Sequence, residues 1–304
     1  MSKKKSFRSI VASLITLVVA LTVVFYALNE TRREPNLEIF AFNLGSGRSV
    51  FIHTPDDERI LIDGGSNSEV VRKITKILPF WSRRIDTVIA TNSLGKNVGG
   101  LIEILNRYEV GEAIVSKFTV ESLGLASSTD QIYGTFIERT DELGLSVKKA
   151  ASGERLVFDL EHGIGVEVLF PTNPDTFEYS KTSAPEIILK ITYGSTSFVI
   201  FGGGTPKIQK FIAASTEFRD PISALIVSNS ATYSNTAAQA IEQWNPEFFV
   251  YSKSTTSHSS SGSGSKEKEN PIASIPEANR YNIKEKGTVK IVSDGSQVRI
   301  ETEM

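Results

Sequence analysis

The chain has no cysteine and only three histidines among its 304 residues. The absence of cysteine excludes disulfides, thiolate zinc sites and cysteine nucleophiles. The histidines are His53, at the end of an early apolar run, His162, in a Glu-His-Gly turn, and His258, in a serine-rich stretch. We expect all three to face solvent, so a transition-metal site built on histidine is not expected.

The chain also lacks an excess of positive charge. It has 33 Lys+Arg against 35 Asp+Glu, a formal net charge of -2. Lys3, Lys4, Lys5 and Arg8 all precede the first apolar run, so the rest of the chain is more acidic than the total suggests. This balance disfavours a protein that binds nucleic acid through general electrostatics, and any such binding has to be local. The hydrophobic share of 40% is that of a folded protein and excludes a disordered or collagen-like chain.

The first informative segment is an uncharged apolar run from Ile10 to Leu28. About 20 such residues span a bilayer. The basic residues before the run predict a cytoplasmic tail at 1–9, a transmembrane helix at 10–28, a linker at 29–35 and an extracytoplasmic remainder. Two alternatives remain. A cleavable signal peptide fits less well because its apolar core is normally shorter, and a buried core helix fits poorly with the uniform hydrophobicity.

Beyond the linker, short β-type runs alternate with helical patterns, which predicts one α/β domain over 36–304. The expected strands share β-branched and aromatic residues between Gly, Pro, Asn and Asp: Leu37–Phe42, Ser49–His53, Arg59–Asp63, Thr87–Thr91, Glu112–Val115, Ser146–Lys149, Arg155–Phe158, Val166–Phe170, Glu186–Tyr193, Ser197–Phe201, Ala224–Val227, Phe248–Tyr251, Thr288–Val292 and Gln297–Glu301.

The clearest helix is expected to begin at a Ser66-Asn67-Ser68 cap and to end before Pro79. Further helices are expected at Gly99–Tyr108, Ser128–Leu143, Pro206–Ala214 and Thr236–Trp244. Strand-rich segments separated by helical crossovers predict two sheets in a layered sandwich. The stretch Ser252–Asn270 is rich in Ser and Gly and then charged, which is typical of a flexible surface loop.

Three segments carry a specific resemblance: Leu37–Pro55, Ile60–Gly65 and the stretch from Thr87 through Asn92 to Gly99-Gly100. They resemble the metallo-β-lactamase-like domain of the ComEC-type DNA-uptake proteins. In that family a V-D-V-G-Q-G-D-S strand precedes a strand ending in D-G-G, and V-I-L-S-H-P-H-A-D-H-I-G-G follows a helix. The similarity continues through Val166–Thr172, Ile187–Gly203 and Ala224–Asn235. It implies an αββα sandwich over essentially the whole chain after Asn36.

The resemblance also implies two metal ions held by His and Asp, and here this chain departs from the family. The family histidines of the S-H-P-H-A-D-H segment correspond to Asn92, Leu94 and Asn97, and its Asp corresponds to Lys96. Later ligand positions hold Phe170, Gly203, the Asn229-Ser230-Ala231-Thr232 stretch and Asn270. Leu, Phe and Gly side chains offer no lone pair, Lys repels a cation, and amides bind Zn²⁺ weakly. No metal, cofactor or catalytic residue is therefore expected.

Asp63 is the acidic residue of the pattern that persists. A carboxylate after a buried strand commonly accepts backbone N–H bonds and fixes the adjoining loops, which is the role we expect here in preference to catalysis. Gly202–Gly204 lacks the pattern of a phosphate loop. Ser228, Ser230 and Ser234 could act as nucleophiles only with a base, for which Lys96 is the available residue.

A remodelled cleft is the candidate ligand site. If the fold is as implied, neutral donors and one cation converge where the family holds metals, and they would suit a small anion or a phosphate of a bound strand. The alternative is a cleft that is merely packed or hydrated. The candidate residues are Asp63, Asn92, Lys96, Asn97, Asn229, Ser230 and Thr232.

These observations predict a membrane-anchored, metal-free and non-catalytic binding or scaffolding module. The resemblance implies a link to DNA uptake at the cell membrane, although the chain lacks the multispanning portion of such proteins. One alternative is a metal-independent hydrolase of phosphodiesters or esters that uses the same cleft. The other is an interaction subunit that binds an envelope protein through Ser252–Asn270.

Overall fold

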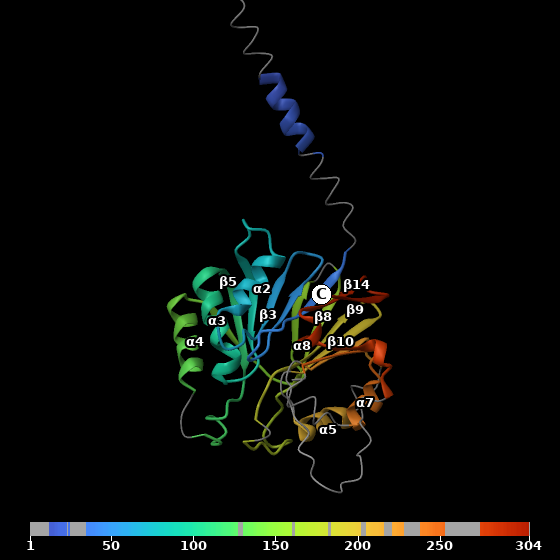
Figure 1. Ribbon diagram of the computed structural model, residues 1–304. Helices are drawn as coiled ribbons and strands as arrows, with labels where there is room; N and C mark the ends of the chain where they lie inside the picture. The colour runs from blue at the N-terminus through green and yellow to red at the C-terminus, as the bar shows by residue number, and fades with distance from the viewer. Residues whose placement is uncertain are drawn as a thin grey trace, which may run out of the picture.

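The computed structural model describes residues 12–22, 24, 35–126, 130–159, 162–181, 184–201, 205–215, 221–227, 238–252 and 274–303. Within these ranges the strands form an eight-stranded and a seven-stranded sheet (Figure 1). The first sheet consists of β1 (Leu37–Ala41), β2 (Val50–His53), β3 (Arg59–Ile62), β4 (Arg84–Ala90), β5 (Glu109–Ser116), β6 (Ser146–Ala150), β14 (Val289–Ser293) and β15 (Val298–Thr302). The second consists of β7 (Arg155–Asp159), β8 (Ile164–Phe170), β9 (Ile188–Tyr193), β10 (Thr196–Phe201), β11 (Ala224–Val227), β12 (Phe248–Tyr251) and β13 (Arg280–Asn282).

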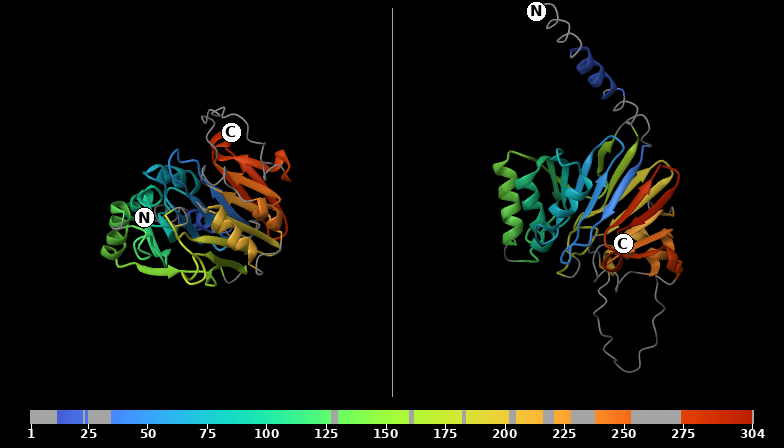
Figure 2. Two further views of the ribbon diagram at one scale, coloured as in Figure 1. Left: turned by 90° about the horizontal axis from the view of Figure 1, so that it is seen from below. Right: turned by 45° about the horizontal axis from the view of Figure 1, so that its top comes forward.

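Most of the helices connect these strands and lie outside the two sheets (Figures 1 and 2), whereas Ile283 of the short α8 packs in the core cluster between the sheets. They are α2 (Glu69–Ile77), α3 (Gly95–Arg107), α4 (Gln131–Glu142), α5 (Pro206–Ala214), α7 (Ala238–Trp244) and α8 (Ile283–Lys286), with a 3-10 turn η3 at Glu277–Asn279. Helix α2 begins at Glu69, after the N-cap residue Ser68; the side chain of Asn67 accepts the Glu69 N–H, and the helix ends before Pro79. The expected cap cluster and the proline stop are both present.

Strand direction decides which loops meet. In the first sheet the order is β15-β14-β1-β2-β3-β4-β5-β6, antiparallel as far as β3 and parallel from β3 to β6. In the second the order is β13-β12-β11-β10-β9-β8-β7, and β10 to β13 are parallel. The carboxyl ends of the parallel strands of one sheet lie at one edge, where binding sites of α/β sheets form.

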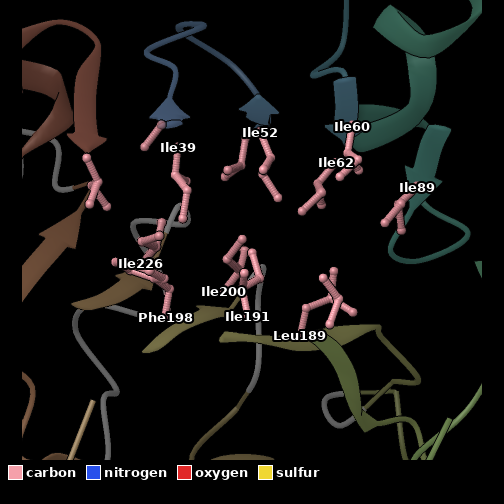
Figure 3. Packing of buried hydrophobic residues seen from close by; sticks show 14 of the residues in the cluster. Ile39, Ile52, Ile60, Ile62, Ile89, Leu189, Ile191, Phe198, Ile200 and Ile226 are labelled. Carbon is pink, nitrogen blue, oxygen red and sulfur yellow. The ribbon is translucent and has the colours of Figure 1, made fainter. Parts of the chain in front are cut away.

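A continuous apolar core lies between the sheets because successive residues of a strand point to opposite faces. Side chains from both sheets interdigitate there, as Figure 3 shows for Ile39, Ile52, Ile60, Ile62 and Ile89 opposite Leu189, Ile191, Phe198, Ile200 and Ile226.

The alternate residues of the same strands face outward and are covered by helices. Leu61 and Val88 pack with α2 and α3 residues such as Ile74 and Leu101 in a second cluster. A third cluster joins strand residues such as Val199 to Ile212 of α5 and to α7. The layers are therefore helix, sheet, sheet and helix, which confirms the expected α/β class and the two-sheet sandwich.

Two local expectations were wrong. Helix α3 begins at Gly95 rather than Gly99, so Lys96 and Asn97 belong to its first turn and not to a loop. Sequence pattern hides this start because Gly95, Lys96 and Asn97 carry no apolar periodicity. The short elements β13 and α8 were also not anticipated, since three or four residues are too few to show a period.

Residues 12–22 are helical. Within the part of the chain that the structure describes, no helix is both long and apolar enough to cross a membrane. The expected span at 10–28 includes residues 10, 11, 23 and 25–28, which lie outside the described ranges, as do the tail at 1–9 and most of the linker at 29–35.

Candidate functional site

A buried ion pair lies at the carboxyl edge of the first sheet. Asp63 directly follows β3, and Arg48 directly precedes Ser49 and β2. The Arg48 Nε donates to Asp63 Oδ2 at 2.5 Å, and the two side chains are 4% and 1% exposed. Two opposite charges so far from solvent interact much more strongly than a surface pair.

Thr91, which follows β4, completes the bonding of the Asp63 carboxylate. Its backbone N–H donates to Asp63 Oδ1 at 2.9 Å and its hydroxyl donates to Oδ2 at 2.8 Å. The Thr91 hydroxyl in turn accepts from the Arg48 guanidinium. Asp63 thus accepts a backbone N–H and ties two loops together, as expected from its position after a buried strand.

Glu186 adds a second carboxylate from the other side of the sandwich. Its Oε1 lies 3.5 Å from Arg48 Nη1, and its side chain is 8% exposed. The next residue, Ile187, donates its N–H to the Thr91 carbonyl at 2.7 Å and leads into β9. Burial acts to lower the pKa of Arg48, but the charges of Glu186 and Asp63 outweigh it and raise that pKa above its ordinary value. The cluster Arg48, Asp63, Thr91 and Glu186, here called the Arg48 cluster, therefore joins the two sheets through a permanent positive charge.

The glycines around Asp63 allow the loop to touch α3. A Cβ on Gly100 would lie 1.9 Å from the Gly64 carbonyl oxygen, and a Cβ on Gly64 would lie 2.4 Å from the Leu101 nitrogen. The Gly64 N–H donates to the Asn97 carbonyl at 2.7 Å, and the Gly100 N–H donates to that of Gly65 at 3.0 Å. The close contact between the Asp63 loop and α3 thus explains the glycines of the Asp-Gly-Gly and Gly-Gly sequences without a metal.

Asn92 and Asn97 bond to each other. Asn97 Nδ2 donates to Asn92 Oδ1 at 3.0 Å, and the Leu94 N–H donates to the same oxygen at 3.2 Å. Asn92 and Asn97 are 7% and 2% exposed. Lys96, between them in the chain, is exposed. The structure thus brings these three together with Asp63 at one edge, but the two amides are buried and bonded to each other, whereas Lys96 is exposed.

Phe170, which corresponds to a ligand position of the family pattern, lies in an aromatic cluster. It is fully buried, and its ring centroid is 5.1 Å from that of Phe177, 5.6 Å from that of Tyr179 and 6.4 Å from that of Phe211. The Tyr179 hydroxyl donates to the Thr172 carbonyl at 2.6 Å, and burial raises the pKa of Tyr179. This corner of the site is filled by packed rings.

The remaining expected site residues lie outside the described ranges. These are Asn229, Ser230 and Thr232, together with Gly203, Ser228, Ser234, Asn270 and the stretch 253–270. Strand β10 ends at Phe201, shortly before Gly203, and strand β11 ends at Val227, directly before Ser228. The Lys284 Nζ, just after β13, donates to the Gly45 carbonyl at 2.7 Å, so the carboxyl edge of the second sheet lies beside that of the first.

A divalent metal does not fit the residues that the structure describes at this edge. Both Asp63 oxygens are engaged by Arg48 and Thr91, and an ion beside them would be repelled by the buried guanidinium. Leu94 and Phe170 offer no donor atom. In the described ranges, no group of three or more His, Cys, Asp or Glu side chains could hold a metal ion.

Two histidines, His53 and His162, are less exposed than expected, and each is paired with a carboxylate. His53 is 22% exposed and lies between two carboxylates, with Nε2 2.7 Å from Asp57 and Nδ1 3.6 Å from Glu38. Burial acts to lower its pKa, but these two neighbours raise it overall. The pairing arises because β1 and β2 place Glu38 opposite His53, a register that sequence alone does not give. His162 Nδ1 lies 2.8 Å from Asp56 Oδ1, and His258 is outside the described residues.

Sequence reasoning missed Arg48 and Glu186. A signal for Arg48 existed: when Phe42–Ser49 is set against the family pattern V-D-V-G-Q-G-D-S, Arg48 falls on the second Asp. This exchange reverses a charge next to Asp63. No comparable signal marks Glu186, since its role depends on the approach of the second sheet.

Comparisons with known proteins give limited similarities. No family model matches the sequence, and no curated protein matches it. Among solved structures, the diiron β-hydroxylase CmlA from Streptomyces venezuelae is 18% identical, with 72% of this chain and 44% of that chain covered and a TM-score of 0.44. A metallo-β-lactamase mutant from Cronobacter sakazakii is 14% identical over 64% and 79%, with a TM-score of 0.43.

A diphosphatase of the PhnP family is 10% identical, with 71% of this chain and 85% of that chain covered and a TM-score of 0.42. This chain spans less than half the length of the CmlA chain it matches. At such identities and scores these similarities carry no conclusion about activity.

Proposed function

We propose that the chain is a membrane-anchored, metal-free and non-catalytic binding module with a metallo-β-lactamase-like αββα fold. The observation that carries this proposal is the buried Arg48 guanidinium in contact with Asp63. It places a guanidinium, paired with Asp63 and Glu186, at the edge where the family resemblance implies metal ions, which supports the metal-free part of the proposal. The helix-sheet-sheet-helix layering and the order of the sequence motifs support the fold assignment.

The chemistry of the described residues favours binding over hydrolysis. A metal-free hydrolase needs a Ser or Thr hydroxyl activated by an adjacent base. Lysine serves as such a base where burial disfavours its charge, whereas Lys96 is exposed. The Thr91 hydroxyl is already bonded to both Asp63 and Arg48. None of these groups is arranged as a nucleophile with its base.

The proposed ligand is an anionic group such as a phosphate of single-stranded DNA. Lys96 provides an exposed cation at the carboxyl edge, beside Asn92 and Asn97. Asn229, Ser230 and Thr232 complete this site in the proposal. A charge-assisted hydrogen bond of this kind contributes about 1.5–3 kcal/mol, and binding is expected to be weak and salt-sensitive.

Membrane anchoring through residues 10–28 belongs to the same proposal. The support is the uncharged run Ile10–Leu28 behind a basic tail, which favours a cytoplasmic N-terminus and an extracytoplasmic domain. A link to DNA uptake follows from the motif resemblance, and an envelope protein that contacts Ser252–Asn270 is the remaining candidate partner.

The test uses the full chain purified in detergent. Nuclease, phosphodiesterase and esterase turnover are measured with and without chelator, together with binding of labelled single-stranded DNA and the bound-metal content. We expect no turnover, no stoichiometric metal and no change of the melting temperature on chelation. Lys96→Ala should weaken DNA binding by about tenfold, as the loss of one charged hydrogen bond predicts. Lys76→Ala, which removes an exposed cation at the other edge of the first sheet, is the matched control and should leave binding unchanged.

Each measurement can contradict the proposal. Turnover that survives chelator and disappears in Lys96→Ala or Ser230→Ala would establish the metal-independent hydrolase. Stoichiometric Zn or Mn whose removal lowers the melting temperature would show that the metal assignment is wrong. Equal loss of DNA binding in Lys96→Ala and Lys76→Ala would show that DNA does not bind at the proposed cleft.

A further inference from the structure

A pair of exposed aromatic side chains projects from the turn between α2 and β4. Phe80 is 86% exposed and Trp81 is 74% exposed. Their rings are in edge-to-face contact, with a centroid distance of 4.8 Å. Such large apolar side chains are normally buried, so two adjacent ones in water point to a surface that they contact.

The turn is held in shape by its neighbours. The Ser82 N–H donates to the Pro79 carbonyl at 2.9 Å, which closes a turn with Phe80 and Trp81 at its two central positions. Leu78, just before the turn, is buried at 6% exposure, and the Ser82 hydroxyl accepts from the Arg59 guanidinium. The aromatic pair is therefore presented on a fixed support.

This turn lies at the edge of the first sheet where the chain enters the domain. β1 is antiparallel to β2, β2 is antiparallel to β3, and β3 is parallel to β4, so the amino ends of β1 and β4 share one edge. β1 begins at Leu37 and β4 begins at Arg84. Three strand spacings separate them, or about 14 Å. Figure 1 shows the cyan loop after α2 at the same end of the molecule as the start of the blue strand β1.

The length of the intervening chain limits how far this edge can lie from a membrane. Residues 29–34 separate Leu28, the last residue of the apolar run, from Pro35. Even fully extended, that segment reaches at most about 24 Å. A bilayer spanned by residues 10–28 therefore lies close to the edge that carries Phe80 and Trp81.

Cations flank the turn, and acidic residues at the same edge partly balance them, since Asp86, Glu109 and Glu58 all act on Arg84. Lys76, Arg83 and Arg84 are exposed around it, and Arg84 is paired with Asp86 at 2.6 Å. The β2–β3 turn at the same edge carries Asp57, whose carboxylate is bonded to Arg59 and His53. Tryptophan favours the membrane interface, and a cation near anionic lipid contributes about 1 kcal/mol.

We propose that the Phe80–Trp81 turn inserts into the headgroup region of the bilayer that the N-terminal run spans, which rests on the proposed membrane anchoring. The contact gives the domain a fixed orientation. Its amino edge faces the lipid, and the Arg48 cluster, at the carboxyl ends of β3 and β4, faces away from it.

The test reads tryptophan fluorescence of the full chain reconstituted in phosphatidylcholine vesicles with a minor share of phosphatidylglycerol. The chain has two tryptophans, and Trp244 is buried at 2% exposure, so Trp81→Phe isolates the Trp81 emission by difference. Lipids brominated near the headgroup end of the acyl chain should quench that emission about twofold, because the ring lies at their depth. Aqueous iodide should quench it little.

Trp81→Phe combined with Ile132→Trp is the matched control. Ile132 is 44% exposed at the start of α4, and its Cβ is near Gly95, beyond the carboxyl end of β4. Tryptophan there should respond to iodide and not to brominated lipid.

Flotation of the vesicles reports the anchoring separately. If the chain floats but Trp81 is quenched by iodide and not by brominated lipid, the turn does not contact lipid and the inference is wrong while anchoring stands. If the chain does not float, anchoring fails and the inference fails with it.

Discussion

The Arg48 guanidinium donates to the Asp63 carboxylate at 2.5 Å, and neither side chain has more than 4% exposure. The pair joins the start of β2 to the end of β3, and Glu186 extends it towards the second sheet. A buried charge that loses its partner is strongly destabilising. This relationship makes the Arg48 cluster the most informative place to test the structure.

Arg48→Met should lower the free energy of unfolding by about 3–5 kcal/mol, because it leaves Asp63 and Glu186 buried without their cation. Urea unfolding followed by circular dichroism measures the change. The triple variant Arg48→Met, Asp63→Asn, Glu186→Gln removes all three charges and should recover most of the loss. A single variant as stable as the wild type would show that the pair is not buried as described.

Gly100→Ala should destabilise the fold by about 1–3 kcal/mol or more, because its Cβ would overlap the Gly64 carbonyl oxygen. Gly134 in α4 is the matched control, since a Cβ there meets nothing within 4 Å. Gly134→Ala should stabilise the helix by about 0.5–1 kcal/mol. Thermal unfolding compares the two variants, and effects of the same sign would contradict the close approach of α3 to the Asp63 loop.

Phe170→Ala should cost about 3–5 kcal/mol, because it opens a cavity among Phe177, Tyr179 and Phe211. Phe80→Ala removes the same side chain at an exposed position and should change stability by no more than about 0.5 kcal/mol. Denaturant midpoints in detergent measure both. Similar losses for the two would mean that the ring of Phe170 is not packed as the structure shows.

Stability should also fall at acidic pH through Glu38. Hydrogen bonds from His53 and Lys290 lower the pKa of Glu38 from 4.5 to about 2. A carboxyl whose folded pKa lies below its unfolded value contributes stability above pH 4.5 that is lost as the pH falls towards 2. With allowance for solvent screening, that loss is about 1–2 kcal/mol.

Glu38→Gln should remove this part of the pH dependence when unfolding is measured across that interval. Lys73 similarly lowers the pKa of Glu303 to about 2, so a smaller slope should remain in the variant. A Glu38→Gln variant with the full wild-type slope would show that Glu38 is not the group responsible.

The sequence predicted the layers because they depend on local pattern. Alternation in β3 and β4 places Ile60, Ile62 and Ile89 between the sheets. Apolar spacing in α2 directs Ile74 towards the outer face of the first sheet. Asp63 was also predicted correctly as a residue that fixes loops, since a carboxylate after a buried strand meets the N–H groups of neighbouring strand ends.

What the sequence could not give depends on contacts between distant segments. Glu186 meets Arg48 only because the second sheet approaches the first at that edge. Asn92 and Asn97 were expected to face a ligand, and their mutual hydrogen bond depends on α3 beginning four residues earlier than its apolar pattern indicates. Whether Asn229, Ser230 and Thr232 join Lys96 stays a prediction.

The guanidinium of Arg48, which is paired with Asp63 and Glu186, has a consequence for how the protein matures. A metal centre has to be loaded with its ion after synthesis. That ion competes with other ions for the site, and a chelator can remove it. A guanidinium is installed by translation, keeps its charge at every physiological pH and cannot be exchanged. This edge of the sandwich therefore acquires its cation at the moment it folds, and it does so equally well in surroundings that contain no free transition metal.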